Sequence, residues 1–376
     1  MARGHMRRIP RLPGHDRTKV MSLNDIATTG SDWHNSPSNA IGGTPLIRLR
    51  QASATTGCEI LAKAEFMNPG GSVKDRAALA IIDNAEQRNL IEPGGIIVEG
   101  TAGNTGIGLA LVANARGYRT IIVMPDTQSE EKRQMLRALG VEQYVVPEAH
   151  HEDPNNYRRV AERMARALAS ETEGGVVWAN QFDNLANRQG HFATTGREIW
   201  EQTHHEVDAF ICSVGTGGTL AGVSRFLKQA NPDVTIGIAD PEGAAMYSYY
   251  TSGKLSYEGR SITEGIGLRW MTGNLEGTQV DYAVQIPDAE TLKTIYSVAS
   301  DDGLFVGGSS GVNVAGAIRL ARKLGPGHTV VTILCDSGAR YQSKLFDAAF
   351  LGSRGLPPPP WRDSGATYPV EQFLER

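Results

Sequence analysis

The feature that most constrains the fold is the regular alternation of short apolar runs and helical patterns from about residue 58 onward. Residues 118–124, 209–214 and 329–334 are apolar almost throughout, whereas a segment such as 72–89 carries its apolar residues at helical spacing. Continuously apolar strands that alternate with helices are typical of parallel sheets covered on both faces. The sequence therefore predicts an α/β fold whose ligands bind at the carboxyl ends of parallel strands.

Length and composition limit the classes of protein to consider. A chain of 376 residues exceeds one ordinary hydrophobic core and predicts two domains. The net charge of −4 gives no indication of nucleic acid or a membrane surface as a partner, and the apolar runs are far shorter than a membrane span. The three cysteines, Cys58, Cys212 and Cys335, are widely spaced, which favours a reducing compartment and argues against a disulfide framework or a structural metal.

The two ends of the chain differ from the rest in composition. Residues 1–32 start with an arginine-rich stretch that lacks the apolar core of a secretory signal, so we expect a basic, disordered tail. Gly-His-Met at residues 4–6 looks like a cloning remnant. We expect a cytoplasmic protein, with organelle targeting by this basic stretch as the alternative. Residues 353–376 contain four consecutive prolines, which favour an extended tail laid over the surface.

The first motif with chemical meaning is Asn-Pro-Gly-Gly-Ser-Val-Lys at residues 68–74, a glycine-rich loop that leads into a helix. It places Lys74 in the first turn, where the helix dipole and desolvation are both expected to disfavour the ammonium form. Such an amine suits a nucleophile that forms a Schiff base and then acts as a general base. A solvated surface lysine is the alternative.

Two further glycine loops follow apolar strands. In residues 99–106, helix N–H groups and the side chains of Thr101, Asn104 and Thr105 predict a site for a carboxylate, with ordinary helix capping as the alternative. In residues 213–222, the glycines let a phosphate approach the backbone and the threonines add hydroxyl donors. This second loop is no dinucleotide fingerprint, because the third glycine of that motif falls on Leu220. A tight turn without a ligand is its alternative.

The remaining motifs are weaker. Gly-Gly-Ser-Ser-Gly at 307–311 and Cys-Asp-Ser-Gly at 335–338 each place hydroxyl groups at the end of a strand or helix. The histidine pairs at 150–151 and 204–205 lack zinc-type spacing and are expected to be solvated, and no metal is expected. The two aspartates at residues 301–302 are typical of a helix end rather than of a catalytic carboxylate pair.

Taken in order, these motifs resemble the fold-type II pyridoxal-phosphate enzymes, most closely the cysteine synthase (O-acetylserine sulfhydrylase) and cystathionine β-synthase group. The resemblance covers residues 41 to 350 and begins with Gly-Gly-Thr-Pro-Leu at 42–46. It implies two parallel-sheet α/β domains of the tryptophan synthase β-like architecture and pyridoxal 5'-phosphate as cofactor. The smaller, mobile domain would comprise residues 68–184, and the larger, cofactor-binding domain residues 33–67 plus 185–352.

The resemblance also implies roles for individual residues. Lys74 would bind the cofactor aldehyde, Asn104 its ring hydroxyl and Ser309 its pyridine nitrogen. The residues implied to hold the phosphate are Gly215, Thr216, Gly217, Gly218 and Thr219. Those implied to hold the substrate are Thr101, Ala102, Gly103, Asn104, Thr105 and Gln181. Many cysteine synthases have serine in place of Ala102, which leaves the substrate open. Residues 264–267 resemble the active-site edge loop of the group.

The implied reaction is β-replacement on an O-activated serine, most simply O-acetylserine plus sulfide giving cysteine and acetate, with Lys74 as the base. Cystathionine β-synthase, acting on serine and homocysteine, is the first alternative. A serine or threonine dehydratase and a specialised β-replacement enzyme with another nucleophile also stay open, as does a catalytically silent relative. By family habit the enzyme is a homodimer whose other partners are small molecules: an amino acid and sulfide or a thiol.

Overall fold

The strands of the computed structural model form two sheets, and the structure describes residues 34–101, 103–127 and 130–363. Residues from Ser36 on form one compact unit. Met1–Asn35 form another, which lies almost wholly outside the described residues, as does the predicted basic tail. Because the expected α/β fold with parallel strands is present, that prediction is confirmed. The predicted boundaries of the two domains stay predictions.

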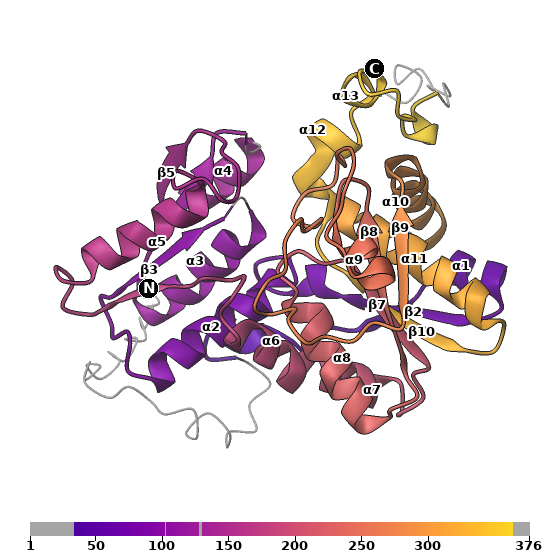
Figure 1. Cartoon of the computed structure of the whole chain (residues 1–376), viewed down its shortest axis with the longest axis horizontal. Helices are drawn as coiled ribbons and strands as arrows, with labels where there is room; N and C mark the ends of the chain where they lie inside the picture. The colour runs from indigo at the N-terminus through magenta and orange to yellow at the C-terminus, as the bar shows by residue number, and fades with distance from the viewer. Residues whose placement is uncertain (1–33, 102, 128–129, 364–376) are drawn as a thin grey trace, which may run out of the picture. The chain divides into compact units, whose positions relative to one another are not determined.

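The smaller sheet has the strand order β5-β4-β3-β6, with every neighbouring pair parallel. Buried aliphatic side chains pack on both of its faces, which explains why the three strands β3, β4 and β6 are mainly apolar, whereas the edge strand β5 is partly polar and exposed. Figure 1 shows these elements in indigo and magenta. Their bounds are β3 (Ile96–Gly100), α3 (Asn104–Arg116), β4 (Arg119–Pro125), α4 (Glu130–Ala138), β5 (Glu142–Val146), α5 (Tyr157–Leu168) and β6 (Val176–Trp178).

The larger sheet has the order β1-β2-β10-β7-β8-β9. Its strands are β1 (Leu46–Arg48), β2 (Glu59–Ala64), β7 (Ala209–Cys212), β8 (Thr235–Pro241), β9 (Tyr282–Ile286) and β10 (Thr329–Leu334). The remaining helices are α1 (Arg50–Thr56), α2 (Lys74–Gln87), α6 (Ala186–His191), α7 (Arg197–Gln202), α8 (Gly218–Ala230), α9 (Met246–Ser252), α10 (Asp288–Asp302), α11 (Gly308–Leu324), α12 (Gln342–Leu345) and α13 (Ala348–Gly352). Helices α10 and α11 pack together beside this sheet (Figure 1).

Two features depart from a simple alternation of parallel strands and regular helices. Strand β1 pairs antiparallel with β2, because residues 49–58 are too few for the dozen or so residues of a parallel crossover. The segment 186–202 is not one regular helix, because α6 and α7 are joined by a π-helical turn at Phe192–Gly196. At the end of this turn Gly196 lies so close to α8 that a Cβ there would be 2.7 Å from the Cβ of Phe226.

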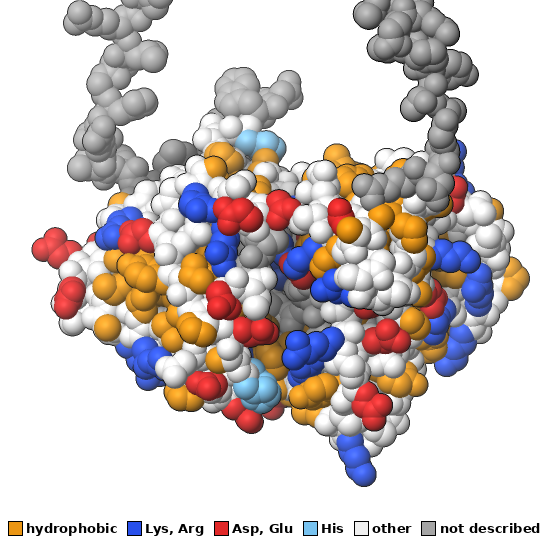
Figure 2. All heavy atoms as spheres, turned by 90° about the horizontal axis from the view of Figure 1, so that it is seen from above, with side chains coloured by type: hydrophobic (Ala, Val, Ile, Leu, Met, Phe, Trp, Pro, Cys, Tyr) orange, Lys and Arg blue, Asp and Glu red, His pale blue; other side chains and the backbone are white. Residues whose placement is uncertain are grey.

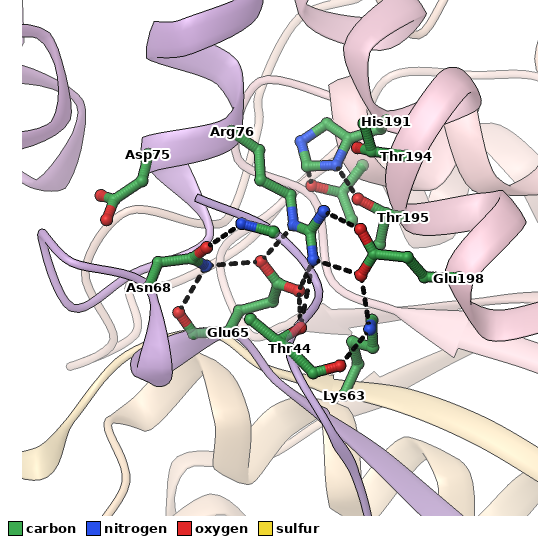
Figure 3. A network of polar contacts seen from close by, with 12 residues as sticks. Thr44, Lys63, Glu65, Asn68, Asp75, Arg76, His191, Thr194, Thr195 and Glu198 are labelled. Atoms are coloured by element: carbon green, nitrogen blue, oxygen red, sulfur yellow. Dashed lines mark hydrogen bonds and ion pairs between the residues drawn. The ribbon is translucent and has the colours of Figure 1, made fainter. Parts of the chain in front are cut away.

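A buried network of charged side chains joins β2, α2 and α7 (Figure 3). Arg76 lies between two carboxylates, with its Nε 2.7 Å from Glu65 Oε2 and its Nη1 2.7 Å from Glu198 Oε1. Lys63 Nζ lies 2.6 Å from Glu198 Oε2. Although burial alone raises the pKa of Glu198, hydrogen bonds and charge interactions with Arg76 and Lys63 lower it to about 2.

The same network holds two of the glycine motifs. Thr44 Oγ1 donates to Glu65 Oε1 at 2.7 Å, and Asn68 Nδ2 donates to Glu65 Oε2 at 2.8 Å. Asn68 Oδ1 in turn accepts from the N–H of Gly42 at 2.9 Å. The loop before α2 and the Gly-Gly-Thr-Pro-Leu motif are therefore fixed by one buried carboxylate.

We expect Arg76→Met to lower the free energy of unfolding by about 3–5 kcal/mol, because it leaves the buried Glu65 carboxylate without its ion-pair partner and Glu198 with Lys63 alone. Urea denaturation followed by circular dichroism measures this loss. Arg119→Met is the matched control, since Arg119 pairs with Glu142 on the exposed surface and should matter little. Equal stability of the two variants would contradict the prediction.

Candidate active site

A cavity of about 300 Å³ lies where loops from both sheets meet. Its walls include Thr101 after β3, Gln181 after β6, Gly215 after β7 and Asp336 after β10. The cavity therefore lies at the carboxyl ends of the strands, where the sequence predicted ligand binding. Figure 2 shows a face of the molecule that is hollowed at its centre, with acidic and basic side chains around the hollow.

Lys74 is the first residue of α2, as predicted, and it is half-buried. It lines this cavity and a smaller one beside it. Its loop is tied to the end of β10, because the N–H of Val73 donates to the carbonyl of Cys335 at 2.9 Å. The alternative of a solvated surface lysine is therefore wrong.

The glycine loop after β7 forms the wall of the smaller cavity with Gly215, Thr216, Gly217 and Thr219. The loop packs so closely against residue 265 that only glycine fits at position 215, since a Cβ on Gly215 would lie 2.2 Å from the carbonyl oxygen of Gly265. That same Cβ would lie 3.9 Å from Lys74 Nζ, so the amine faces this loop. Helix α8 begins at Gly218, which brings the N–H groups of its first turn to the loop.

Asn104 is held by a carboxylate that the sequence analysis did not select. Its Nδ2 donates to Asp336 Oδ2 at 2.6 Å, and its Oδ1 accepts from Arg340. The hydroxyl of Tyr341 donates to the same Asp336 oxygen at 2.6 Å. Asp336 lies in the Cys-Asp-Ser-Gly motif, which the sequence analysis selected for the hydroxyl group of its serine. Because the motif follows a strand, the same argument would have placed the Asp336 carboxylate near the ligand.

The predicted carboxylate loop is connected to a second buried carboxyl group. Thr105 Oγ1 donates to Gln181 Oε1 at 2.5 Å, and Gln181 Nε2 donates to Glu99 Oε1 at 3.1 Å. Thr101 and Gly103 also line the cavity. Ala102 lies outside the described residues. Glu99 was missed because a single carboxylate at the end of a strand carries no motif of its own.

The edge loop at residues 264–267 closes one side of the cavity. Lys132 of α4 and Lys344 of α12 both form ion pairs with Glu264. Trp270, which also lines the cavity, stacks on His151 with 4.9 Å between ring centroids. His151, expected to be solvated, is thus half-buried against an aromatic residue distant in sequence.

The donor set fits pyridoxal phosphate, which carries an aldehyde, a ring hydroxyl, a pyridine nitrogen and a phosphate. The Lys74 amine, the Asn104 amide and the Ser309 hydroxyl all line the larger cavity, and the threonines of the loop after β7 line the adjoining one. Within the described part of the chain, the buried Oγ of Ser213, beside that loop, has no hydrogen-bond partner. Each polar group of the cofactor thus has a residue of suitable chemistry in these cavities.

Glu99 gives the protein a pH-dependent stability. Burial raises its pKa to about 8 from an ordinary value of 4.5, against the opposing effects of Gln181 and Arg158. A carboxyl group with a raised folded-state pKa contributes stability that is complete below its unfolded pKa and is lost as pH rises through the folded one. The free energy of unfolding should therefore decline between pH 4.5 and about 8 on account of this residue.

Glu99→Gln keeps an acceptor for Gln181 but removes the titration, so we expect a flatter profile of thermal midpoint against pH over this interval. The measurement is thermal unfolding at several pH values for the parent and the variant. Glu142→Gln, at the end of an exposed strand, serves as the control. Its thermal midpoint should change with pH as steeply as that of the parent. Parallel profiles for the parent and Glu99→Gln would contradict the prediction.

The comparisons with known proteins agree with this geometry. Residues 37–336 match the family described as pyridoxal-phosphate dependent enzyme. The chain is 52% identical to cysteine synthase 1 of Neurospora crassa over 322 residues, which cover 84% of each chain. It is 42% identical to cysteine synthase of Dictyostelium discoideum over 340 residues, which cover 87% of this chain and 89% of the relative.

Among solved structures, the crystal structure of O-ureido-L-serine synthase matches with a TM-score of 0.76 and 35% identity, covering 84% of this chain and 96% of that one. The family match spans well over half of the chain. This chain therefore belongs to the pyridoxal-phosphate-dependent enzymes, and pyridoxal phosphate is its cofactor.

Proposed function

We propose that the chain is a cysteine synthase, which converts O-acetylserine and sulfide into cysteine and acetate. The observation that carries the proposal is the 52% identity to cysteine synthase 1 of Neurospora crassa over 84% of both chains. The cavity supports it, because the Lys74 amine lies in the same cavity as the loop suited to a carboxylate. The nucleophile in this reaction needs little room in the cavity, since sulfide has a single heavy atom.

Bound pyridoxal phosphate supplies an electron sink for bond cleavage at Cα of the amino acid. The hydroxyl of Thr101 and the second N–H of the Gln181 amide hold the substrate carboxylate and so fix the direction of the Cα–H bond. Thr105 keeps the Gln181 side chain in place by donating to its Oε1. Lys74 removes the α-proton, acetate leaves from Cβ, and the sulfur of the incoming sulfide forms a bond to Cβ. Lys74 then returns a proton to Cα, which completes the exchange of acetate for sulfur.

Ser309 supports elimination rather than transamination. It lies in the first turn of α11, is 6% exposed and lines the cavity. A neutral hydroxyl does not hold a pyridine nitrogen protonated as a carboxylate does. Ser309 would therefore leave the ring nitrogen unprotonated, which would favour loss of the leaving group over transamination.

The first experiment is a titration of the purified holoenzyme with O-acetylserine, followed by sulfide, monitored by absorbance. We expect O-acetylserine to replace the near-visible band of the resting enzyme and sulfide to restore it, with one cysteine formed per turnover. An unchanged band with O-acetylserine would rule out that donor.

Lys74→Ala should abolish the near-visible band of the purified protein and all formation of cysteine, because the other lysine of the cavity, Lys132, is held in an ion pair with Glu264 and does not replace it. Lys293→Ala, at an exposed position on α10, is the matched control and should keep both. A Lys74→Ala protein with the parental spectrum and turnover would refute the assignment of this lysine.

A second candidate is β-replacement with another nucleophile, which the 35% identity to O-ureido-L-serine synthase supports. It predicts that O-acetylserine changes the spectrum while sulfide restores it poorly. Serine with homocysteine tests the cystathionine β-synthase alternative. Product identification by mass spectrometry separates these reactions.

We also propose a cytoplasmic homodimer in which residues 68–184 move as the smaller domain. Three free cysteines, two of them buried, are compatible with a reducing compartment. Within the described residues, no helix has the length and apolar character needed to cross a bilayer. Light scattering after size exclusion tests the dimer, and fractionation of cells that express the full chain tests the location.

A further inference from the structure

Helix α4 carries a buried lysine, Lys132, that lines the larger cavity. Lys132 is 5% exposed and forms, with Leu136, the buried face of an otherwise polar helix. Leu136 packs on the start of α3, since a Cβ on Gly106 would lie 3.2 Å from Leu136 Cδ2. Because residues four apart lie on the same face of a helix, this contact holds Lys132 over the predicted carboxylate loop.

The side chain of Lys132 crosses Gly103 of that loop. A Cβ on Gly103 would lie 3.6 Å from Lys132 Cδ and 3.5 Å from Lys132 Nζ. Thr101, Gly103 and Thr105 line the same cavity as Lys132. Helix α3 begins at the residue after Gly103, which brings the N–H groups of its first turn to the loop. The ammonium group therefore lies beside the position that we assign to the substrate carboxylate.

The ammonium group of Lys132 has hydrogen-bonding capacity left for a ligand. An ammonium has three N–H donors. Among the residues that the structure describes, Lys132 Nζ has one acceptor, the Glu264 carboxylate, and lies 4.9 Å from the centroid of the Tyr341 ring. Lys63, which is also buried, has three acceptors, and these are Thr44 O, Gln202 Oε1 and Glu198 Oε2. Lys63 is thus saturated within the protein, whereas Lys132 is not.

Glu264 has a second cationic partner that stays available to it. Lys132 pairs with Glu264 Oε2, and Lys344 of α12 pairs with Oε1. Although burial alone raises the pKa of Glu264, the charges and hydrogen bonds of these two lysines lower it, so the group is a carboxylate at neutral pH. Lys132 can therefore leave Glu264 without leaving a buried carboxylate unpaired.

We propose that Lys132 binds the carboxylate of the amino-acid substrate and exchanges its contact with Glu264 for this new partner when the substrate arrives. Lys344 keeps Glu264 paired during the exchange. Alanine at position 102 provides no side-chain donor, so the ammonium adds charge to a loop whose other donors are neutral. The inference rests on the step that all the proposed reactions share, the binding of an α-amino acid, and is independent of the nucleophile.

The test compares serine with serinamide, which carries a neutral amide in place of the carboxylate. The dissociation constants of both ligands are measured on the purified holoenzyme from the change in its near-visible band. We define the carboxylate ratio as the constant for serinamide divided by the constant for serine. Lys132→Met should lower this ratio about tenfold, because serine loses a charge-assisted hydrogen bond that serinamide does not make. Comparing each ligand with itself across variants cancels the different basicity of the two amines.

Lys323→Met is the matched control. Lys323 Nζ also lies over a tyrosine ring, 4.8 Å from the centroid of Tyr282, but on the exposed surface of α11. It should keep the parental ratio. An unchanged ratio in Lys132→Met, even with weaker binding of both ligands, would mean a merely structural role and overturn the proposal. A parent enzyme whose band responds to neither ligand would instead refute the proposed function.

Two variants that keep Lys132 test the exchange, and they also decide the question if Lys132→Met does not fold. Glu264→Gln removes the competing carboxylate and should raise the carboxylate ratio about threefold. Lys344→Met leaves Glu264 with Lys132 alone, which holds Lys132 back from the substrate, and should lower the ratio about threefold. A ratio that stays the same or moves in the opposite direction in either variant would overturn the exchange.

Discussion

The structure depends on one buried interaction, the pairing of Arg76 with Glu65 and Glu198. Three charged groups with little exposure are expensive to bury separately, so they are stable only together. Their pairing fixes α2 against β2 and α7. Because α2 begins at Lys74, two residues before Arg76, the network also determines where the reactive amine lies.

Several side chains that line the cavity are held in place by hydrogen bonds from neighbouring buried polar groups. Asn104 is held by Asp336, and Gln181 by Glu99. The two threonines of the loop after β7 are held in the same way by α6. A side chain with one hydrogen bond already made in a fixed direction has fewer orientations to lose when a ligand binds. Such a site is organised before the cofactor arrives.

Glycine determines how close these layers come. At Gly215 and Gly222 any side chain would overlap a neighbouring backbone atom, at 2.2 Å and 2.3 Å respectively. The loop after β7 can therefore approach the edge loop at residues 264–267, and α8 can approach α6, more closely than ordinary residues would permit. Such close contacts, more than flexibility of the backbone, explain why this chain is rich in glycine.

The sequence by itself determined the alternating α/β order, the loops that follow strands and the position of Lys74 at the start of a helix, because periodicity and glycine spacing are local properties. It could not determine the antiparallel β1, the π-helical turn at Phe192–Gly196 or the stacking of His151 on Trp270. Those features depend on which distant segments meet. Only the tertiary structure placed Asp336 in the wall of the cavity and Glu99, Asn187 and His191 behind it. A single buried polar residue leaves no pattern in the chain, and its role depends on the partner that packing brings to it.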